Sequence, residues 1–363
     1  LFRSQVTGIG RDAFDVANFM FRHLRGGLGV GTVGANAIFA AITGISIASA
    51  AVFTRLAVPE MLRHGYTARF AVGVVAGSSV LGMLIPPSLL LILYGILTEQ
   101  SVGDLFLAGI LPGILLAFLF GLTVVLMAYF MPGFIGRNLS PSKEGDMGVT
   151  DLFRKSAPIV TLIGLVLGGI YGGLFTPVES GAVGCIAAIA IGLVRRSLSW
   201  NDFWSVLTDT GIVTASICFL IIAAQMYSRM LAISGLPAEF GTWIATADIG
   251  FWGVVLAYVA LVIVMGTILD SSSIMLILVP IILPVMVSFN ADLIWFGIVT
   301  IIAVEIGLLT PPFGISVYVI KSTLEDQSIT LGSIFAGAAP FALMMLLALG
   351  LVLAFPILTT GLL

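Results

Sequence analysis

Two Pro-Pro pairs, each 40 residues after a serine, have the spacing in this chain that best suits ion binding. Pro86-Pro87 follows Ser46, and Pro311-Pro312 follows Ser271 at the same distance. Proline has no amide N–H, so a helix that contains it leaves the carbonyl four residues earlier without a partner. Inside a membrane such a carbonyl is costly unless something satisfies it. One pair would favour a simple kink, whereas the repeated spacing favours two cation sites.

The same reasoning names the atoms that would bind the ions. The prolines free four backbone carbonyls, and the preceding polar segments add hydroxyl and carboxylate oxygens. The predicted sodium ligands are Ser46, Ser49, Gly82 and Met83 in the first half, and Asp270, Ser271, Gly307 and Leu308 in the second. Asp and Ser are also preferred helix N-caps, and we expect these side chains to cap and to bind at once.

Glu305 lies about one turn before the second break and is a functional candidate because acids inside membranes are costly. Bonds from helix N–H groups or from a buried hydroxyl explain it equally well. With no Lys or Arg near the polar segments, an anionic substrate would be held by helix N-termini, hydroxyls and bound cations. The predicted substrate-binding residues are Thr43, Gly44, Ser88, Ser272, Ser273, Thr310 and Ser316.

Other chemistry has no support in the sequence. His23 and His64 fall in polar loops, and Cys185 and Cys218 lie in apolar runs without metal-binding spacing. There is no nucleophile motif, phosphate-binding loop or paired-aspartate protease pattern. The net charge of −3 argues against a nucleic-acid partner. We therefore expect neither enzymatic activity nor an organic cofactor.

The composition of the chain indicates a membrane protein. Of 363 residues, 59% are hydrophobic and 9% charged, against roughly 25% charged in soluble proteins. Lipid must cover much of such a surface, so we predict an all-α polytopic membrane protein. The predicted full spans are 69–97, 106–130, 158–175, 178–194, 211–232, 295–320 and 334–361, with a separate interfacial helix over 198–209.

Two further apolar stretches, 28–56 and 253–288, are each long enough for two short helices and have small polar residues at their centres. This pattern predicts re-entrant hairpins, which turn near mid-depth and leave on the side from which they entered. Irregular backbone at that depth is tolerated only against protein or a water-filled cavity. The tips of the two hairpins are predicted at 43–49 and 266–273.

The chain repeats itself with an offset of 225 residues. Ser46 aligns with Ser271, and the turn residue Gly65 aligns with the turn residue Asn290. Repeats with interrupted helices at matching positions indicate a secondary transporter. The predicted division is a first repeat over 1–130, a cytoplasmic loop with connecting helices and the interfacial segment over 131–210, and a second repeat over 211–363.

Charge gives the orientation of the two halves. Basic residues flank the first hairpin, whereas acids flank the second, with no Lys or Arg between Arg229 and Lys321. The positive-inside rule then places the open end of the first hairpin in the cytoplasm and that of the second outside. The repeats are therefore predicted to be inverted, as alternating access requires. The C-terminus should lie on the periplasmic side.

Several motifs resemble the large permease subunit (M, or DctM-type) of TRAP transporters. They lie at 58–66, 82–88, 107–113, 266–270 and 305–314, and the resemblance covers essentially the whole chain. By motif match, the sodium sites of that family fall on Ser46, Ser49 and 82–83, and on Asp270, Ser271 and 307–308. Ala303 departs from the pattern, because members often carry Asn there.

The resemblance implies a fold of the ion-transporter superfamily with a moving elevator domain, in a bacterial inner membrane. It further implies sodium as the coupling ion, a small membrane subunit (Q type) and a periplasmic binding protein (P type). The substrate would be a carboxylate, such as a dicarboxylate or a sialic acid. Two alternatives remain: a stand-alone sodium/dicarboxylate symporter of related fold, and a passive channel that conducts without a sodium gradient.

Overall fold

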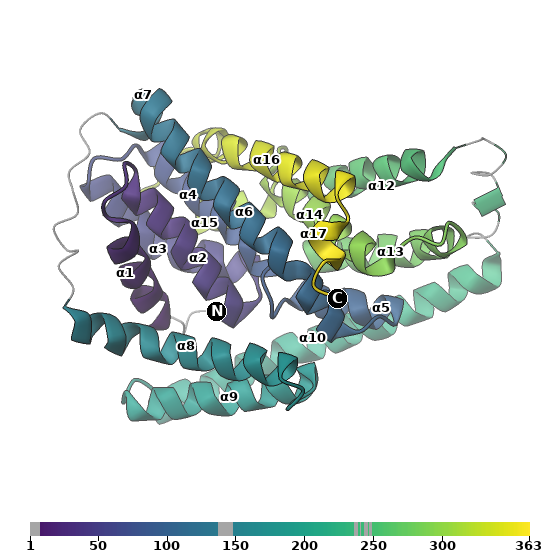
Figure 1. The fold of residues 1–363 in the computed structure, drawn as a ribbon, viewed down its shortest axis with the longest axis horizontal. Helices are drawn as coiled ribbons and strands as arrows, with labels where there is room; N and C mark the ends of the chain where they lie inside the picture. The colour runs from purple at the N-terminus through teal and green to yellow at the C-terminus, as the bar shows by residue number, and fades with distance from the viewer. Residues whose placement is uncertain (1–7, 137–147, 236–238, 240, 243–245, 247–248) are drawn as a thin grey trace.

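The computed structural model describes residues 8–363 except 137–147, 236–238, 240, 243–245 and 247–248 (Figure 1). Helices form all the regular structure of these residues. The first part comprises α1 (Ile9–Phe21), α2 (Gly27–Thr43), α3 (Ser46–Arg63), α4 (Ala68–Ser79), the 3-10 helix η1 (Val80–Met83), α5 (Leu89–Thr98), α6 (Val102–Phe130) and α7 (Pro132–Ile135). The remainder comprises α8 (Val149–Tyr171), α9 (Pro177–Val194), α10 (Trp200–Ser234), α12 (Phe251–Gly266), α13 (Ser271–Ser288), α14 (Leu293–Leu309), α15 (Ile315–Thr323), α16 (Leu331–Ala354) and α17 (Ile357–Thr360).

Both predicted hairpins form. In the first, α2 ends at Thr43, and Gly44 turns the chain with φ 62°, a conformation that glycine adopts without steric cost. Helix α3 then begins at Ser46. In the second hairpin, α12 ends at Gly266 and α13 begins at Ser271. Figure 1 shows the α2–α3 pair and the α12–α13 pair on opposite sides of the molecule.

Both Pro-Pro pairs interrupt a helix, as predicted. The α4–η1 segment stops before Pro86-Pro87, and α5 starts at Leu89. Likewise α14 stops at Leu309 before Pro311-Pro312, and α15 follows. The peptide bond within each pair is cis. The predicted spans 69–97 and 295–320 are therefore pairs of shorter helices rather than single rods.

Among the described residues, 6 helices are long and apolar enough to cross a membrane: α6, α8, α9, α10, α13 and α16. Five of these coincide with predicted full spans, and α13 belongs to the second hairpin. The interfacial helix predicted over 198–209 is helical but is not a separate element, because it is the first part of α10, which runs unbroken from Trp200 to Ser234. The Ser199 hydroxyl caps its start by accepting the Asp202 N–H at 3.1 Å, and no proline follows within the helix.

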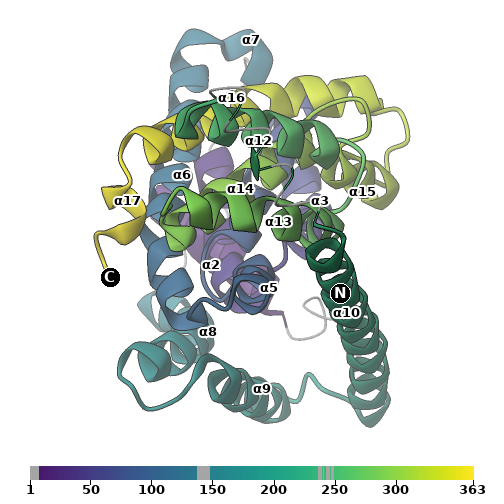
Figure 2. The same ribbon diagram turned by 90° about the vertical axis from the view of Figure 1, so that its right-hand side faces the viewer.

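The interior of the bundle forms around α14, whose residues from Trp295 to Leu309 are all buried. Helix α16 packs on α14 and on α4 of the other repeat. A Cβ atom added to Gly73 of α4 would lie 2.2 Å from the Gly337 carbonyl oxygen of α16, so glycine lets these helices approach. By contrast, α8, α9 and α10 lie along one side of the molecule with most of their surface uncovered (Figures 1 and 2).

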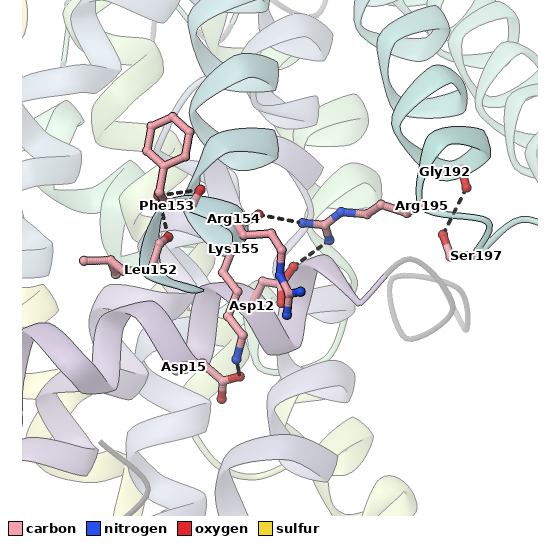
Figure 3. A network of polar contacts seen from close by, with 10 residues as sticks. Asp12, Asp15, Leu152, Phe153, Arg154, Lys155, Gly192, Arg195 and Ser197 are labelled. Atoms are coloured by element: carbon pink, nitrogen blue, oxygen red, sulfur yellow. Dashed lines mark hydrogen bonds and ion pairs between the residues drawn. The ribbon is translucent and has the colours of Figure 1, made fainter. Parts of the chain in front are cut away.

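An ion-pair network joins α1 to α8 and α9 (Figure 3). The Arg195 guanidinium at the end of α9 donates to Asp12 Oδ2 at 2.6 Å and to the Arg154 carbonyl at 3.2 Å. Lys155 of α8 donates to Asp15 Oδ2 at 2.5 Å. Since α1 also packs along α2 and α3, this network connects the first hairpin to α8 and α9.

Candidate functional site

Each hairpin tip is seated against the broken helix of its own repeat. The Leu89 N–H, just after the first break, donates to the Gly44 carbonyl at 3.2 Å. The Gly314 N–H, just after the second, donates to the Thr267 carbonyl at 3.1 Å. Positions 89 and 314 differ by the 225-residue offset of the repeat. The two halves therefore join tip and break through equivalent donors, although the acceptors Gly44 and Thr267 are 223 residues apart.

Glycine permits this close approach at Gly82 and Gly307, which are again related by the offset. A Cβ on Gly82 would lie 2.9 Å from the Ile45 carbonyl carbon, and one on Gly307 would lie 2.5 Å from Gly266 Cα. Either distance would force backbone apart. The sequence prediction used these two glycines for their carbonyls only. The alignment of Gly82 with Gly307 across the repeat is the sequence signal for this close backbone approach.

The expectation that all four carbonyls before the breaks lack partners is wrong for two of them. Met83 O accepts a hydrogen bond from the Ser88 hydroxyl, and Gly307 O accepts the Thr310 N–H at 3.0 Å. Ser88 follows the first break, whereas Thr310 is the C-cap of α14 and precedes the second break. The carbonyls of Gly82 and Leu308 accept no hydrogen bond within the described part of the chain, because the residues four positions later are prolines.

The first tip carries hydroxyls that nothing satisfies. Ser46 and Ser49 lie in the first turn of α3, both fully buried, and neither Oγ has a hydrogen-bond partner among the described residues. Ile45, not Ser46, is the N-cap of α3, and no side chain caps this helix. The predicted capping role is therefore wrong for Ser46. Thr43 instead donates to the Phe39 carbonyl of its own helix at 2.9 Å.

The Asp270 carboxylate of the second tip accepts hydrogen bonds from residues of the same tip. Asp270 caps α13: its Oδ2 accepts the N–H groups of Ser272 at 3.0 Å and Ser273 at 3.2 Å, and its Oδ1 accepts the Ser273 hydroxyl. The predicted capping role of Asp270 is confirmed. The carboxylate turns toward its own helix and occupies the positive end of the helix dipole.

Glu305 connects the two tips. It lies on α14, and only 1% of its surface is exposed. Its Oε1 accepts the Ser271 hydroxyl of the second tip at 3.2 Å. The Ser46 hydroxyl of the first tip lies next to the same carboxyl group, yet neither Ser46 Oγ nor Glu305 Oε2 has a partner among the described residues. Of the explanations considered for Glu305, a bond from a buried hydroxyl is present.

The remaining predicted residues lie at the ends of helices around the tips. Ser88 caps α5, Thr310 donates to the Ile306 carbonyl at 2.7 Å, and Ser316 of α15 is buried without a partner in the described region. Ser272 and Ser273 are half-buried in the first turn of α13. Helix α5 packs against α13 and α15 against α3. The second half of each broken helix thus lies beside the hairpin of the opposite repeat.

Two helical hairpins seated on two interrupted helices, with buried oxygens between them, define a polytopic membrane transport protein. The family model for the DctM component of tripartite ATP-independent periplasmic transporters matches residues 4–358. This chain belongs to that family. It is therefore the large permease component of a transporter, a multi-pass protein of the inner membrane, and not an enzyme.

Relatives agree with this placement. The chain is 32% identical over 350 residues to the C4-dicarboxylate TRAP transporter large permease protein DctM of Pseudomonas aeruginosa, covering 96% of this chain and 80% of that one. It is 28% identical to the sialic acid TRAP transporter permease protein SiaT of Haemophilus influenzae, over 96% and 56% of the two chains. It is 29% identical to the ectoine TRAP transporter large permease protein TeaC of Halomonas elongata, over 92% and 77%.

Proposed function

We propose that this chain is the membrane permease subunit of a sodium-coupled secondary transporter that imports a small organic acid. A periplasmic binding protein would deliver the substrate, and a small membrane subunit would support the permease. The tripartite nature of the family supports both partners. A related permease from Oleidesulfovibrio alaskensis is named isethionate TRAP transporter permease protein DctMQ, and this chain covers 55% of it.

The observation that carries sodium coupling is the set of unpartnered oxygens at the first tip. Buried hydroxyls are normally hydrogen-bonded, whereas Ser46 and Ser49 have no partner among the described residues, and a bound cation would satisfy them. The Gly82 backbone lies against the same tip, within contact of Ile45 and Ser46. Hydroxyl and carbonyl oxygens are suited to a hard cation. We assign this first site to Ser46, Ser49 and the carbonyls of Gly82 and Met83.

The second sodium site follows from the repeat. It would use Asp270, Ser271 and the carbonyls of Gly307 and Leu308, of which Leu308 O is without a hydrogen-bond partner in the described residues. Capping occupies both lone pairs of Asp270 Oδ2, which accepts two N–H groups, but Oδ1 accepts only the Ser273 hydroxyl and keeps a further lone pair. Backbone contact between Gly266 and Gly307 brings the tip and the break together here as well.

An organic acid fits the ends of the helices. Helices α3, α5, α13 and α15 all begin beside the tips, and helix N-termini attract anions. Thr43, Gly44, Ser88, Ser272, Ser273, Thr310 and Ser316 are the groups from which we expect the substrate site to be built. Movement of the hairpins and broken helices as one elevator domain would then carry substrate and sodium across the membrane.

Uptake into proteoliposomes tests this function. The complete complex, with its small subunit and binding protein, should accumulate substrate when a sodium gradient is imposed. Equal rates under a potassium or a proton gradient would contradict sodium coupling. Full uptake without the binding protein would favour the stand-alone sodium/dicarboxylate symporter. Flux that never saturates and continues without any gradient of sodium would favour the passive channel.

A further inference from the structure

The first hairpin tip contains buried oxygens but no acid. Between residues 28 and 56 the only charged side chain is that of Arg55. A cation held by Ser46 and Ser49 would therefore have no opposing charge from its own hairpin. A buried charge without a counter-charge is strongly unfavourable. Before an anionic substrate binds, the charge that balances such a cation has to come from another element of the chain.

Two acids are close enough to the tips to be considered, and they differ in availability. Asp270 directs both carboxylate oxygens to donors in the first turn of α13. Glu305 has only one oxygen engaged, through Ser271, and its Oε2 is buried and has no partner in the part of the chain described. The unpartnered Ser46 hydroxyl lies beside this carboxyl group.

We propose that Glu305 of the second repeat is a shared ligand, which supplies the carboxylate for the cation at the first tip while it holds Ser271 of the second tip. Glu305 Oε2 and Ser46 Oγ would contact the same sodium ion, and Glu305 Oε1 would keep the second tip in register. The inference rests on the proposed sodium coupling and extends it. The first repeat would complete its cation site only when Glu305 of the second repeat is in place.

A sodium titration of protein stability tests this assignment. The melting temperature of the purified complex is measured against sodium concentration, with choline replacing sodium to hold ionic strength constant. Glu305→Gln keeps the shape and removes the charge, so the sodium concentration for half-maximal stabilisation should rise at least tenfold. Glu305→Asp keeps the charge and should recover part of that affinity. Glu325→Gln, a change at an exposed loop acid, is the matched control and should leave the titration unchanged.

A purely structural role gives a different result. If Glu305 only braces Ser271, Glu305→Gln lowers the melting temperature equally at every sodium concentration and leaves the midpoint unmoved, which overturns the inference. We expect instead that without sodium the Gln variant melts at or above the wild-type temperature, because an unbalanced buried charge is gone. If the Gln variant does not assemble, Glu305→Asp decides. An unchanged sodium midpoint in Glu305→Asp overturns the inference, and a raised midpoint supports it.

The wild-type titration separates this inference from the proposed function. If sodium stabilises the wild-type complex and Glu305→Gln has the same midpoint, only the role of Glu305 is wrong. If sodium has no effect on the wild-type complex, sodium coupling is wrong, and the shared-ligand role is wrong with it.

Discussion

The two hairpins have the same architecture but satisfy their polar groups in opposite ways. The second tip is closed by its own residues, since Asp270 caps α13 through three hydrogen bonds. The first tip has no side-chain cap, and its two buried serine hydroxyls have no partners in the described structure. A repeat that is symmetrical in backbone is therefore asymmetrical in hydrogen bonding.

The two Pro-Pro breaks also differ in how exposed their residues are. Pro86 is buried and Pro87 half-buried, whereas Pro311, Pro312 and Phe313 are exposed. The first break is thus enclosed, and the serine hydroxyls of the first tip have no partner among the described residues. The chain after the second break is exposed, although Ser271, Gly307 and Leu308 beside it are buried. We infer that the second tip holds its shape without an ion and that the first tip is ordered by one.

Labelling of the open ends of the hairpins tests the broadest form of this comparison. Arg63→Cys and Ser288→Cys place exposed thiols at corresponding ends of α3 and α13. The adjacent turn residues Gly65 and Asn290 have φ of 84° and 52°, so cysteine is better placed beside them. In a background without the exposed Cys185 and Cys218, an impermeant maleimide should label position 288 from the periplasm and position 63 only after permeabilisation. Labelling of both from one face would disprove the inverted arrangement and the periplasmic C-terminus.

Alanine at the paired glycines tests what the halves share. Gly82→Ala and Gly307→Ala should each destabilise the protein by roughly 1–3 kcal/mol, the cost of overpacking. Gly307→Ala should be the worse of the two, since its Cβ would come within 2.5 Å of backbone. Gly164→Ala is the control, because nothing lies within 4 Å of its Cβ position. Thermal melting in detergent measures all three, and a neutral Gly307→Ala would mean that tip and break are not in contact.

Removal of one oxygen at each tip tests how the halves differ. Without sodium, Ser46→Ala should leave stability unchanged because it breaks no hydrogen bond, whereas Asp270→Ala should cost about 1 kcal/mol for the lost cap. Both should raise the sodium concentration for half-maximal uptake by about tenfold, if each loses about 1.4 kcal/mol of ion binding. Asp270→Asn keeps the cap and isolates the effect of charge. Equal stability losses for Ser46→Ala and Asp270→Ala would contradict the difference in hydrogen bonding between the two tips.

The smallest expected effect concerns the ion pairs that join α1, which packs on the first hairpin, to α8 and α9. The second hairpin, predicted over 253–288, contains Asp270 as its single charged residue. A double-mutant cycle of Asp12→Ala and Arg195→Ala should give a coupling of about 0.5–1 kcal/mol, as for other partly exposed pairs. Denaturation in detergent measures this coupling. Asp15 pairs with Lys155, so Asp15→Ala and Lys155→Ala form a second cycle. Zero coupling in both cycles would mean that the network does not hold α1 in place.

The backbone design was predictable from sequence because small, breaking residues mark it. Gly44, the Ser46/Ser271 pair and the Pro-Pro pairs specify turns and interruptions locally, and the structure has all of them. Helix α1 was missed because its charged residues, Arg11, Asp12 and Asp15, hide an amphipathic pattern within a short polar segment. The continuity of α10 was missed because Asp209 and Gly211 imitate a boundary.

The side-chain contacts of the site were less predictable, since they depend on tertiary packing. Whether Ser88 reaches Met83 O, or whether Glu305 stands between Ser46 and Ser271, depends on rotamers and on elements far apart in sequence. The pattern of breakers located the site, but it could not show which oxygens already had partners. The ligand assignments therefore stay predictions, now narrowed by the hydrogen bonds that are present.

The unbroken α10 also determines how deep this protein sits in a bilayer. Its 35 residues span about 52 Å at 1.5 Å per residue, well beyond a hydrocarbon core of about 30 Å. The stretch between its charged residues Asp209 and Arg229 contains 19 residues, or about 28 Å, and matches that core without tilt. The first turns, with exposed Trp200 and Trp204, must then project among the lipid headgroups, where Trp side chains are favoured.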